Sequence, residues 1–359
     1  MIAGGGTGGH LFPGLALAAE LSERAGANQV MFVGTRRGIE ARRVPAAGYR
    51  LATIEVRGLK GRGLLGWLGG LLRLPRAVVQ AWRIISGFRP GVVVGVGGYA
   101  SAPVVMAAWL RRLPVVLLEQ NALPGFTNRV LGRLARVVVV AFAEARQFFA
   151  RRKVRLLGNP VRRQLLQAAG QPLPGQRNLL IFGGSQGARA LNQALPEALE
   201  QVQRRLGRLN IRHQTGEGDY RQVRESYQRL GLEARVERFI DDMAGALQWA
   251  DLVICRAGAT TVAELAVIGR PAVLVPYPHA ADDHQTVNAR ALVAAGAARL
   301  LPQRDLNPES LAQLLVQLLG QPRQLEEMAR AAAGLGRPEA AARIADLCLE
   351  LARAGRGGR

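Results

Sequence analysis

Cysteine is nearly absent from this sequence: the chain of 359 residues contains only two, Cys255 and Cys348. Two thiols supply neither a disulfide framework nor the paired spacing of a zinc site, so the sequence indicates a reducing compartment. Aromatic residues are also scarce, at 5%. A nucleic-acid-binding protein would need aromatic stacking platforms among clustered basic residues. Aromatic residues are few here and the arginines are scattered, so nucleic-acid binding is only a remote alternative for the function of this chain.

A long hydrophobic run is lacking as well. Residues 90–110 carry no charge and would be long enough to cross a bilayer. Gly97, Gly98, Ser101 and Pro103 interrupt this segment, which therefore predicts a buried strand, a glycine turn and a helix. Because only three residues precede the first glycine loop, we expect no signal peptide. We interpret the short first strand as a start codon placed slightly downstream of the true one.

Basic residues dominate the charge of the chain. The formal net charge is +22, and only Lys60 and Lys153 are lysines. This charge is compatible with anionic lipid, anionic substrates or nucleic acid as partners. A compositional preference for arginine is a further explanation, so the charge alone decides nothing.

Short β-branched runs alternate with longer helical patterns along the whole chain. Parallel strands that are buried on both faces have this pattern, with crossover helices between them. Two stretches, 2–10 and 179–188, each lead from an apolar strand through a glycine loop into a helix. The sequence therefore predicts an α/β protein with two Rossmann-like domains. The predicted strands lie in QVMFVGT, PGVVVGVGG, LPVVLLEQ, ARVVVVAF and KVRLLGNP, then in RNLLIFGGS, NIRHQTG, ARVERFI, ADLVICRAG and PAVLVPYP.

Three glycine loops are the clearest functional signal: GGGTGGH at 4–10, GVGGYAS at 95–101 and GGSQGA at 183–188. Each follows a predicted strand and can open a helix, so that backbone N–H groups and the helix dipole converge on an anion. None fits the dinucleotide fingerprint, because no ribose-binding acid follows at the required distance. A tight strand–helix turn is the alternative for any single loop, but three together favour a phosphate-bearing substrate.

The second half adds polar residues at successive strand ends. Thr260 and Thr261 stand where a helix would begin, and they could cap it or donate to phosphate. Glu264, one turn further on, could accept both hydroxyls of a ribose; a solvated helix position is the alternative. The segment with His284, Gln285 and Asn288 suits sugar hydroxyls, or it is an ordinary polar helix start.

These motifs together resemble the MurG family, the UDP-N-acetylglucosamine:lipid I N-acetylglucosaminyltransferases of glycosyltransferase family 28. The resemblance covers about residues 2–351. It is carried by GGGTGGHLFPGLALAAEL, VGTRRGIE, GVGGYASAP, EQNALPGFTNR, GNPVR, GGSQGARALN, FIDDM, CRAGATTVAEL and ADDHQTVNA. A related enzyme that glycosylates diacylglycerol is an alternative, but it should lack GGYAS and EQNALPG.

The resemblance implies a GT-B fold, with two Rossmann-like domains facing a substrate cleft. The implied acceptor domain spans residues 1–158 and is joined by a last helix at about 338–355; the UDP-GlcNAc-binding domain spans 159–337. The implied reaction is an inverting transfer of GlcNAc from UDP-GlcNAc to the 4-hydroxyl of MurNAc in lipid I, giving lipid II and UDP. No cofactor and no protein-bound metal are implied.

The resemblance also assigns residues. Ser185 should touch the diphosphate, the Ile240 backbone should read uracil, Glu264 should hold the ribose and Gln285 the GlcNAc hydroxyls; His284 stays unassigned. The donor-binding residues are Thr7, Gly8, Gly9, Asn121, Arg162, Ser185, Ile240, Ala259, Thr260, Thr261, Val262, Ala263, Glu264 and Gln285. The loops expected to meet the acceptor diphosphate contain Gly6, Gly97, Gly98 and Tyr99.

His10 is the expected catalytic base. It should lie in the first turn of the helix that follows the glycine loop, where Pro13 is tolerated because first-turn N–H groups lack helical partners. The positive end of that helix should disfavour the imidazolium form, so that a neutral His10 can accept the proton of the acceptor hydroxyl.

A membrane surface is the other expected partner. Between Lys60 and Arg76 the sequence mixes leucines, a tryptophan and arginines, as in helices that lie in the headgroup region of anionic bilayers. A helix packed on the domain core is the alternative. The residues proposed for membrane contact are Leu64, Leu65, Trp67, Leu68, Arg73 and Arg76. We expect a peripheral protein on the cytoplasmic face of the inner membrane, with UDP-GlcNAc, lipid I and other cell-wall synthesis proteins as partners and no nucleic acid.

Overall fold

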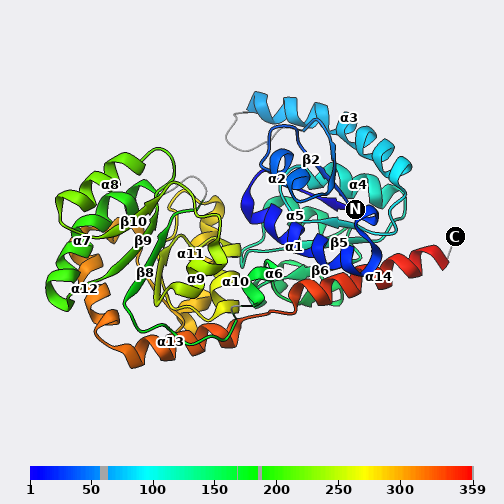
Figure 1. Cartoon of the computed structure of the whole chain (residues 1–359). Coiled ribbons are helices and arrows are strands. Elements are labelled where there is room, and N and C mark those ends of the chain that lie inside the picture. Colours follow the sequence, from blue (N-terminus) through cyan, green and yellow to red (C-terminus); the bar gives the residue numbers. More distant parts are fainter. Residues whose placement is uncertain (57–63, 168, 185–187, 358–359) are drawn as a thin grey trace. The chain divides into compact units, whose positions relative to one another are not determined.

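The chain divides into two compact units in the computed structural model (Figure 1). The first unit comprises residues 1–162 and 337–359, and the second comprises residues 163–336. The sequence prediction places this division at 158/159 and again near 337. The structure describes residues 1–56, 64–167, 169–184 and 188–357, without the side chains of 64–73, 356 and 357. None of the described helices is long and apolar enough to cross a membrane.

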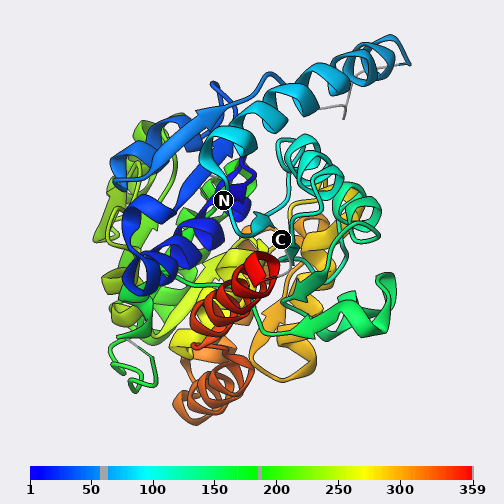
Figure 2. The same cartoon turned by 90° about the vertical axis from the view of Figure 1, so that its right-hand side faces the viewer.

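A parallel sheet forms the centre of the first unit, with the strand order β3-β2-β1-β4-β5-β6-β7. Its strands are β1 Ile2–Ala3, β2 Met31–Gly34, β3 Arg50–Thr53, β4 Val93–Gly95, β5 Val115–Glu119, β6 Val137–Val140 and β7 Val154–Leu156. Its helices are α1 Gly8–Ala25, α2 Glu40–Ala46, α3 Leu64–Phe88, α4 Ser101–Leu110, α5 Phe126–Leu131 and α14 Ala340–Gly357. Helix α3 extends past the other elements of this unit (Figure 2).

Alternate residues of these strands enter two different hydrophobic cores. In β5, Val115 and Leu117 pack with α3 and α4, whereas Val116 and Leu118 pack with α1 and α14. A parallel sheet with helices on both faces needs apolar side chains at every strand position. This explains the uninterrupted apolar runs, and it confirms that residues 90–110 form a strand, a glycine turn and a helix.

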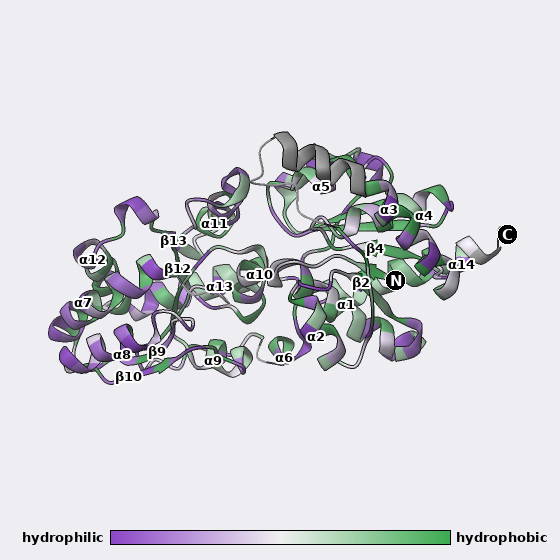
Figure 3. Ribbon diagram, turned by 90° about the horizontal axis from the view of Figure 1, so that it is seen from above, coloured by the Kyte–Doolittle hydropathy of each residue, from purple (hydrophilic) through white to green (hydrophobic). Residues whose placement is uncertain are grey.

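The second unit repeats the arrangement, with the strand order β10-β9-β8-β11-β12-β13, again all parallel. Its strands are β8 Asn178–Phe182, β9 Asn210–Gln214, β10 Ala234–Glu237, β11 Leu252–Cys255, β12 Ala272–Leu274 and β13 Ala298–Leu300. Its helices are α6 Arg163–Leu166, α7 Arg189–Leu206, α8 Tyr220–Arg229, α9 Met243–Trp249, α10 Ala259–Ile268, α11 His284–Ala294, α12 Pro308–Leu319 and α13 Pro322–Leu335. Helices such as α7 and α12 carry hydrophilic and hydrophobic residues side by side (Figure 3).

Two local predictions differ from the structure. Strands β3 and β13 were not predicted, because these short edge strands contain no valine or isoleucine, whereas the predicted edge strands β7 and β10 each contain a valine. Pro13 was expected in the first turn of its helix, but α1 begins at Gly8 and Pro13 lies in the second turn.

Candidate active site

The glycine loops lie where each sheet reverses its strand order. Strands β1 and β4 are neighbours in the first unit, and β8 and β11 are neighbours in the second. The crossover connections leave in opposite directions at these points, which opens a crevice at the carboxyl ends of the strands. Residues 4–7 and 96–100 follow the first pair, and residues 183–188 and 256–258 follow the second. Each sheet is therefore expected to have its ligand crevice at this point.

A buried carboxylate shapes the first glycine loop. Glu40 is fully buried and accepts hydrogen bonds from the N–H of Gly6 at 2.8 Å and from both N–H and hydroxyl of Thr35 at 2.9 and 2.8 Å. A Cβ on Gly5, Gly34 or Gly38 would overlap the Glu40 side chain. The VGTRRGIE motif therefore holds the loop after β1 in place, a role that the sequence did not reveal.

His10 lies in the first turn of α1, beside the loop after β4. Its Nδ1 is 3.3 Å from Oε1 of Gln120, whose Nε2 donates to the carbonyl of Val96 at 2.9 Å. A Cβ on Gly97, which has φ = 96°, would come within 2.7 Å of Nδ1 of His10. Only glycine fits there without moving the imidazole, so the structure brings the predicted base together with the GVGGYAS loop.

Tyr99 and Gly98 complete this loop. The ring of Tyr99 is 41% exposed and lies close to Gly6, and the carbonyl of Gly98 accepts from the Ser101 hydroxyl at 2.8 Å. Because the N–H of Gly6 already donates to Glu40, an acceptor diphosphate would have to use other donors of the loop. Contact between these residues and the acceptor stays a prediction.

Asn121 and Arg162 are the remaining predicted donor residues of the first unit besides Thr7, Gly8 and Gly9. The backbone and side-chain amides of Asn121 donate to Oε1 of Glu119, and Asn128 donates to Oε2. Burial raises the pKa of Glu119, although these hydrogen bonds oppose the shift. The guanidinium of Arg162 lies 5.2 Å from the centre of the Phe12 ring.

In the second unit, Glu264 faces the interior of the protein. Helix α10 begins after Gly258, which has no side-chain cap, so Thr260 and Thr261 lie within its first turn and do not cap it. Glu264 is only 5% exposed. The side chain is thus shielded from water, and the alternative of a solvated helix position is wrong. A buried carboxylate needs polar partners.

Two glutamines hold loops that contain or adjoin predicted donor-site residues. Gln214, which the sequence analysis did not single out, donates to the carbonyl of Gly184 at 2.8 Å and accepts from the N–H of Ile240 at 3.2 Å. It thereby ties the loop that contains Ser185, itself outside the described residues, to the predicted uracil-reading residue. Oε1 of Gln285 accepts from the N–H of Tyr277 at 2.8 Å, which leaves its NH₂ group as the donor end.

The adjacent aspartates of the FIDDM and ADDHQTVNA motifs, and the polar residues next to them, have local structural roles. Asp242 caps α9 by accepting from the N–H of Gly245 at 2.9 Å. Asp282 and Asp283 both adopt left-handed backbone conformations in the turn before α11. Nδ1 of His284 lies 2.7 Å from the carbonyl of Ala281. Within the described residues, no cluster of three metal-binding side chains occurs.

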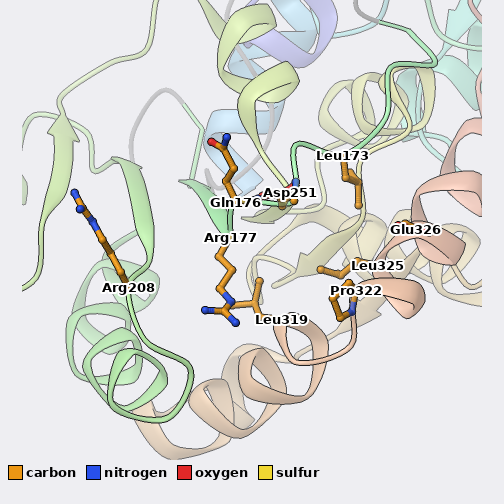
Figure 4. Close-up of a pocket in the computed structure, with 10 residues that line it drawn as sticks. Leu173, Gln176, Arg177, Arg208, Asp251, Leu319, Pro322, Leu325 and Glu326 are labelled. Carbon is orange, nitrogen blue, oxygen red and sulfur yellow. The ribbon is translucent and has the colours of Figure 1, made fainter.

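A pocket of about 290 Å³ lies at the amino ends of the strands of the second sheet, the end opposite the glycine loops (Figure 4). The carboxylate of Asp251 in this pocket accepts from the N–H groups of Gly175, Gln176 and Asn178. Arg177 donates to the carbonyl of Leu206, and Arg208 pairs with Glu233. These groups hold the starts of the strands together, so the pocket is a structural feature.

Two family descriptions match the chain: the glycosyltransferase family 28 N-terminal domain at residues 1–140 and the C-terminal domain at residues 178–344. The UDP-N-acetylglucosamine–N-acetylmuramyl-(pentapeptide) pyrophosphoryl-undecaprenol N-acetylglucosamine transferase of Anaeromyxobacter sp. (strain K) is 54% identical over 98% of this chain and 93% of its own length. This chain belongs to the MurG family. The enzyme of the same name from Myxococcus xanthus is 53% identical over 98% of this chain and 92% of its own.

A solved MurG structure agrees with this assignment. Acinetobacter baumannii MurG has 38% sequence identity, a TM-score of 0.80 and 98% coverage of both chains. MurG family membership confirms the resemblance, the α/β fold of two parallel-sheet domains and the class of a UDP-GlcNAc-dependent hexosyltransferase. The roles of individual residues, and a common cleft, stay predictions.

Proposed function

We propose that this chain catalyses the inverting transfer of GlcNAc from UDP-GlcNAc to the 4-hydroxyl of MurNAc in lipid I, giving lipid II and UDP. Its identity as a MurG-type transferase of peptidoglycan synthesis rests on the identity of 54% over 98% of the chain. The observation that supports the mechanism is the contact of His10, in the first turn of α1, with Gln120 and with the loop after β4.

We assign proton transfer to a residue of the first unit and donor binding mainly to residues of the second. His10 accepts the proton of the acceptor hydroxyl, whose oxygen attacks the anomeric carbon while the bond to UDP breaks. Glu264 holds the ribose hydroxyls, the Ile240 backbone reads uracil and Gln285 binds the GlcNAc hydroxyls through its NH₂ group. The phosphates bind near the N-terminus of α7, where a helix end favours negative charge.

A transfer assay tests this function. Radiolabelled GlcNAc should pass from UDP-GlcNAc to a lipid I analogue, and the product should run with the lipid fraction. Diacylglycerol in place of the lipid I analogue should stay unlabelled. Labelling of diacylglycerol alone would contradict the proposal.

We also propose that α3 and α4 attach the protein to the cytoplasmic face of the inner membrane. The side chains of Leu64, Leu65, Trp67, Leu68 and Arg73 lie outside the described part of α3. In the described parts of α3 and α4, the large apolar side chains Val79, Trp82, Trp109 and Leu110 are 41–53% exposed. The guanidinium of Arg111 lies 4.8 Å from the centre of the Trp82 ring, and Arg76 and Arg83 are exposed nearby on α3. Exposed apolar groups with a basic fringe suit an anionic bilayer.

Reversing the charge of Arg73 and Arg76 together to glutamate should weaken binding to anionic liposomes by at least about tenfold, since each basic residue near such a surface contributes about 1 kcal/mol. Affinity for UDP-GlcNAc should not change. Arg221→Glu with Arg224→Glu, an exposed pair of the same spacing on α8, is the matched control. Co-sedimentation at low salt measures both, and equal binding of the two double variants would overturn the membrane assignment.

A further inference from the structure

Gln120 connects the end of β4 to the ring of His10. It follows β5 directly and is only 2% exposed. Both ends of its side-chain amide are engaged: Nε2 donates to the Val96 carbonyl at 2.9 Å, and Oε1 lies 3.3 Å from Nδ1 of His10. The residue stands between Glu119 and Asn121, and no motif in the sequence points to a role for it.

Hydrogen-bond chemistry determines the orientation of this amide. The carbonyl of Val96 can only accept, so the amide end that faces it must be the NH₂ group. The opposite orientation would place two buried oxygens 2.9 Å apart and leave both unsatisfied. The Val96 backbone is itself held in the sheet, because its N–H donates to the carbonyl of Ala3 at 2.9 Å.

The orientation of Gln120 then determines the tautomer of His10. Oε1 of Gln120 can only accept, so Nδ1 of His10 must carry the hydrogen. A neutral imidazole has one N–H, which means that the lone pair resides on Nε2. The ring packs closely over Gly97, where an added Cβ would come within 2.7 Å of Nδ1.

We propose that Gln120 is a positioning residue that holds His10 as the Nδ1–H tautomer and so presents Nε2 as the proton-accepting atom. The assignment of the tautomer concerns the resting protein, whereas its consequence for rate rests on the proposed function of His10. In the reaction, the proton of the acceptor hydroxyl passes to Nε2, the oxygen bonds to the anomeric carbon, and UDP leaves with the electron pair of the broken bond. Gln120 keeps its hydrogen bond to Nδ1–H throughout.

The ionisable groups on the neighbouring segments have partners of their own. Glu40 is bonded to Gly6 and Thr35, and Glu119 is bonded to Asn121 and Asn128. Tyr99 packs close to Gly6. The group that bonds Nδ1 of His10 is thus a neutral amide, which fixes a tautomer without the charge that a carboxylate would add.

Nitrogen NMR of the parent protein tests the tautomer directly. The four histidines are labelled with ¹⁵N, and the His10 signals are identified by their loss in His10→Ala. At a pH where His10 is neutral, we expect a protonated Nδ1 and an unprotonated Nε2. A protonated Nε2 in the parent would overturn the proposal without any variant having to fold.

Two substitutions extend the test. Gln120→Leu removes the acceptor, so the Nε2–H tautomer should appear and kcat should fall at least about tenfold with KM for UDP-GlcNAc unchanged. In Gln120→Glu a protonated carboxyl can donate to the Val96 carbonyl and still accept from Nδ1–H, so the Nδ1–H tautomer should persist. The exposed Gln147→Leu is the control, with tautomer and kcat unchanged.

The outcomes separate the two proposals. A Gln120→Leu protein with the tautomer of the parent would refute the role of Gln120. A changed tautomer with an unchanged kcat would instead refute His10 as the base, and the positioning role in catalysis with it.

Discussion

Replacing His10 with alanine is expected to lower kcat by at least about 10²-fold, the lower bound for loss of a general base. Without the imidazole, the acceptor hydroxyl must lose its proton to water while it attacks the anomeric carbon. The measurement is steady-state transfer of GlcNAc to a lipid I analogue at saturating UDP-GlcNAc, with kcat and KM determined separately.

The affinity of this variant for UDP serves as its internal control. The residues expected to hold the nucleotide most directly, Glu264 and Ile240, belong to the second unit, so the Kd for UDP should stay near that of the parent. A folded His10→Ala protein whose turnover is within a fewfold of the parent would remove His10 from the mechanism.

Replacing Glu264 with alanine is expected to weaken UDP binding on the order of 10²-fold, because a buried carboxylate that accepts two ribose hydroxyls makes charge-assisted hydrogen bonds. Calorimetric titration with UDP measures this loss. The melting temperature of the variant should be determined alongside, since Glu264 is 5% exposed and its removal leaves a small cavity.

Gln285→Ala is the matched comparison, because Gln285 is expected to contact the sugar and not the nucleotide. Its Kd for UDP should equal that of the parent, whereas KM for UDP-GlcNAc should rise and discrimination against UDP-GalNAc should relax. If both variants bind UDP and UDP-GlcNAc like the parent, the donor site lies elsewhere.

The central strands of both sheets could be predicted from sequence, and two of the four edge strands could not. Central strands such as β5 and β6 are buried on both faces, so their apolar runs are unambiguous. Edge strands β3 and β13 contain neither valine nor isoleucine, unlike the predicted edge strands β7 and β10, so their sequences resemble those of loops. The position of Pro13 was misjudged because α1 begins two residues before His10.

The residues of the candidate site could likewise be predicted only in part. Glycine loops can be recognised by their composition, and His10 directly follows one in the sequence. Glu40 and Gln120 act through partners 34 and 110 residues away in sequence, and no local pattern encodes such a pairing. Gln214 was equally hidden, since its two hydrogen bonds join loops that are separate in sequence. A surplus of glycine around an isolated glutamate, as in VGTRRGIE, is the signal that could have pointed to Glu40.

The return of the chain to the first unit through α14 bears on how the protein is made. Ile344, Ala345 and Cys348 of α14 belong to the core that also contains β1 and α1. During synthesis on the ribosome, the first unit therefore cannot complete this core until α14, its last helix, has emerged. The second unit is one continuous segment, residues 163–336, and has all of its parts sooner. The unit encoded second is thus the first that can complete its folding during synthesis, a reversal of the usual N-to-C order.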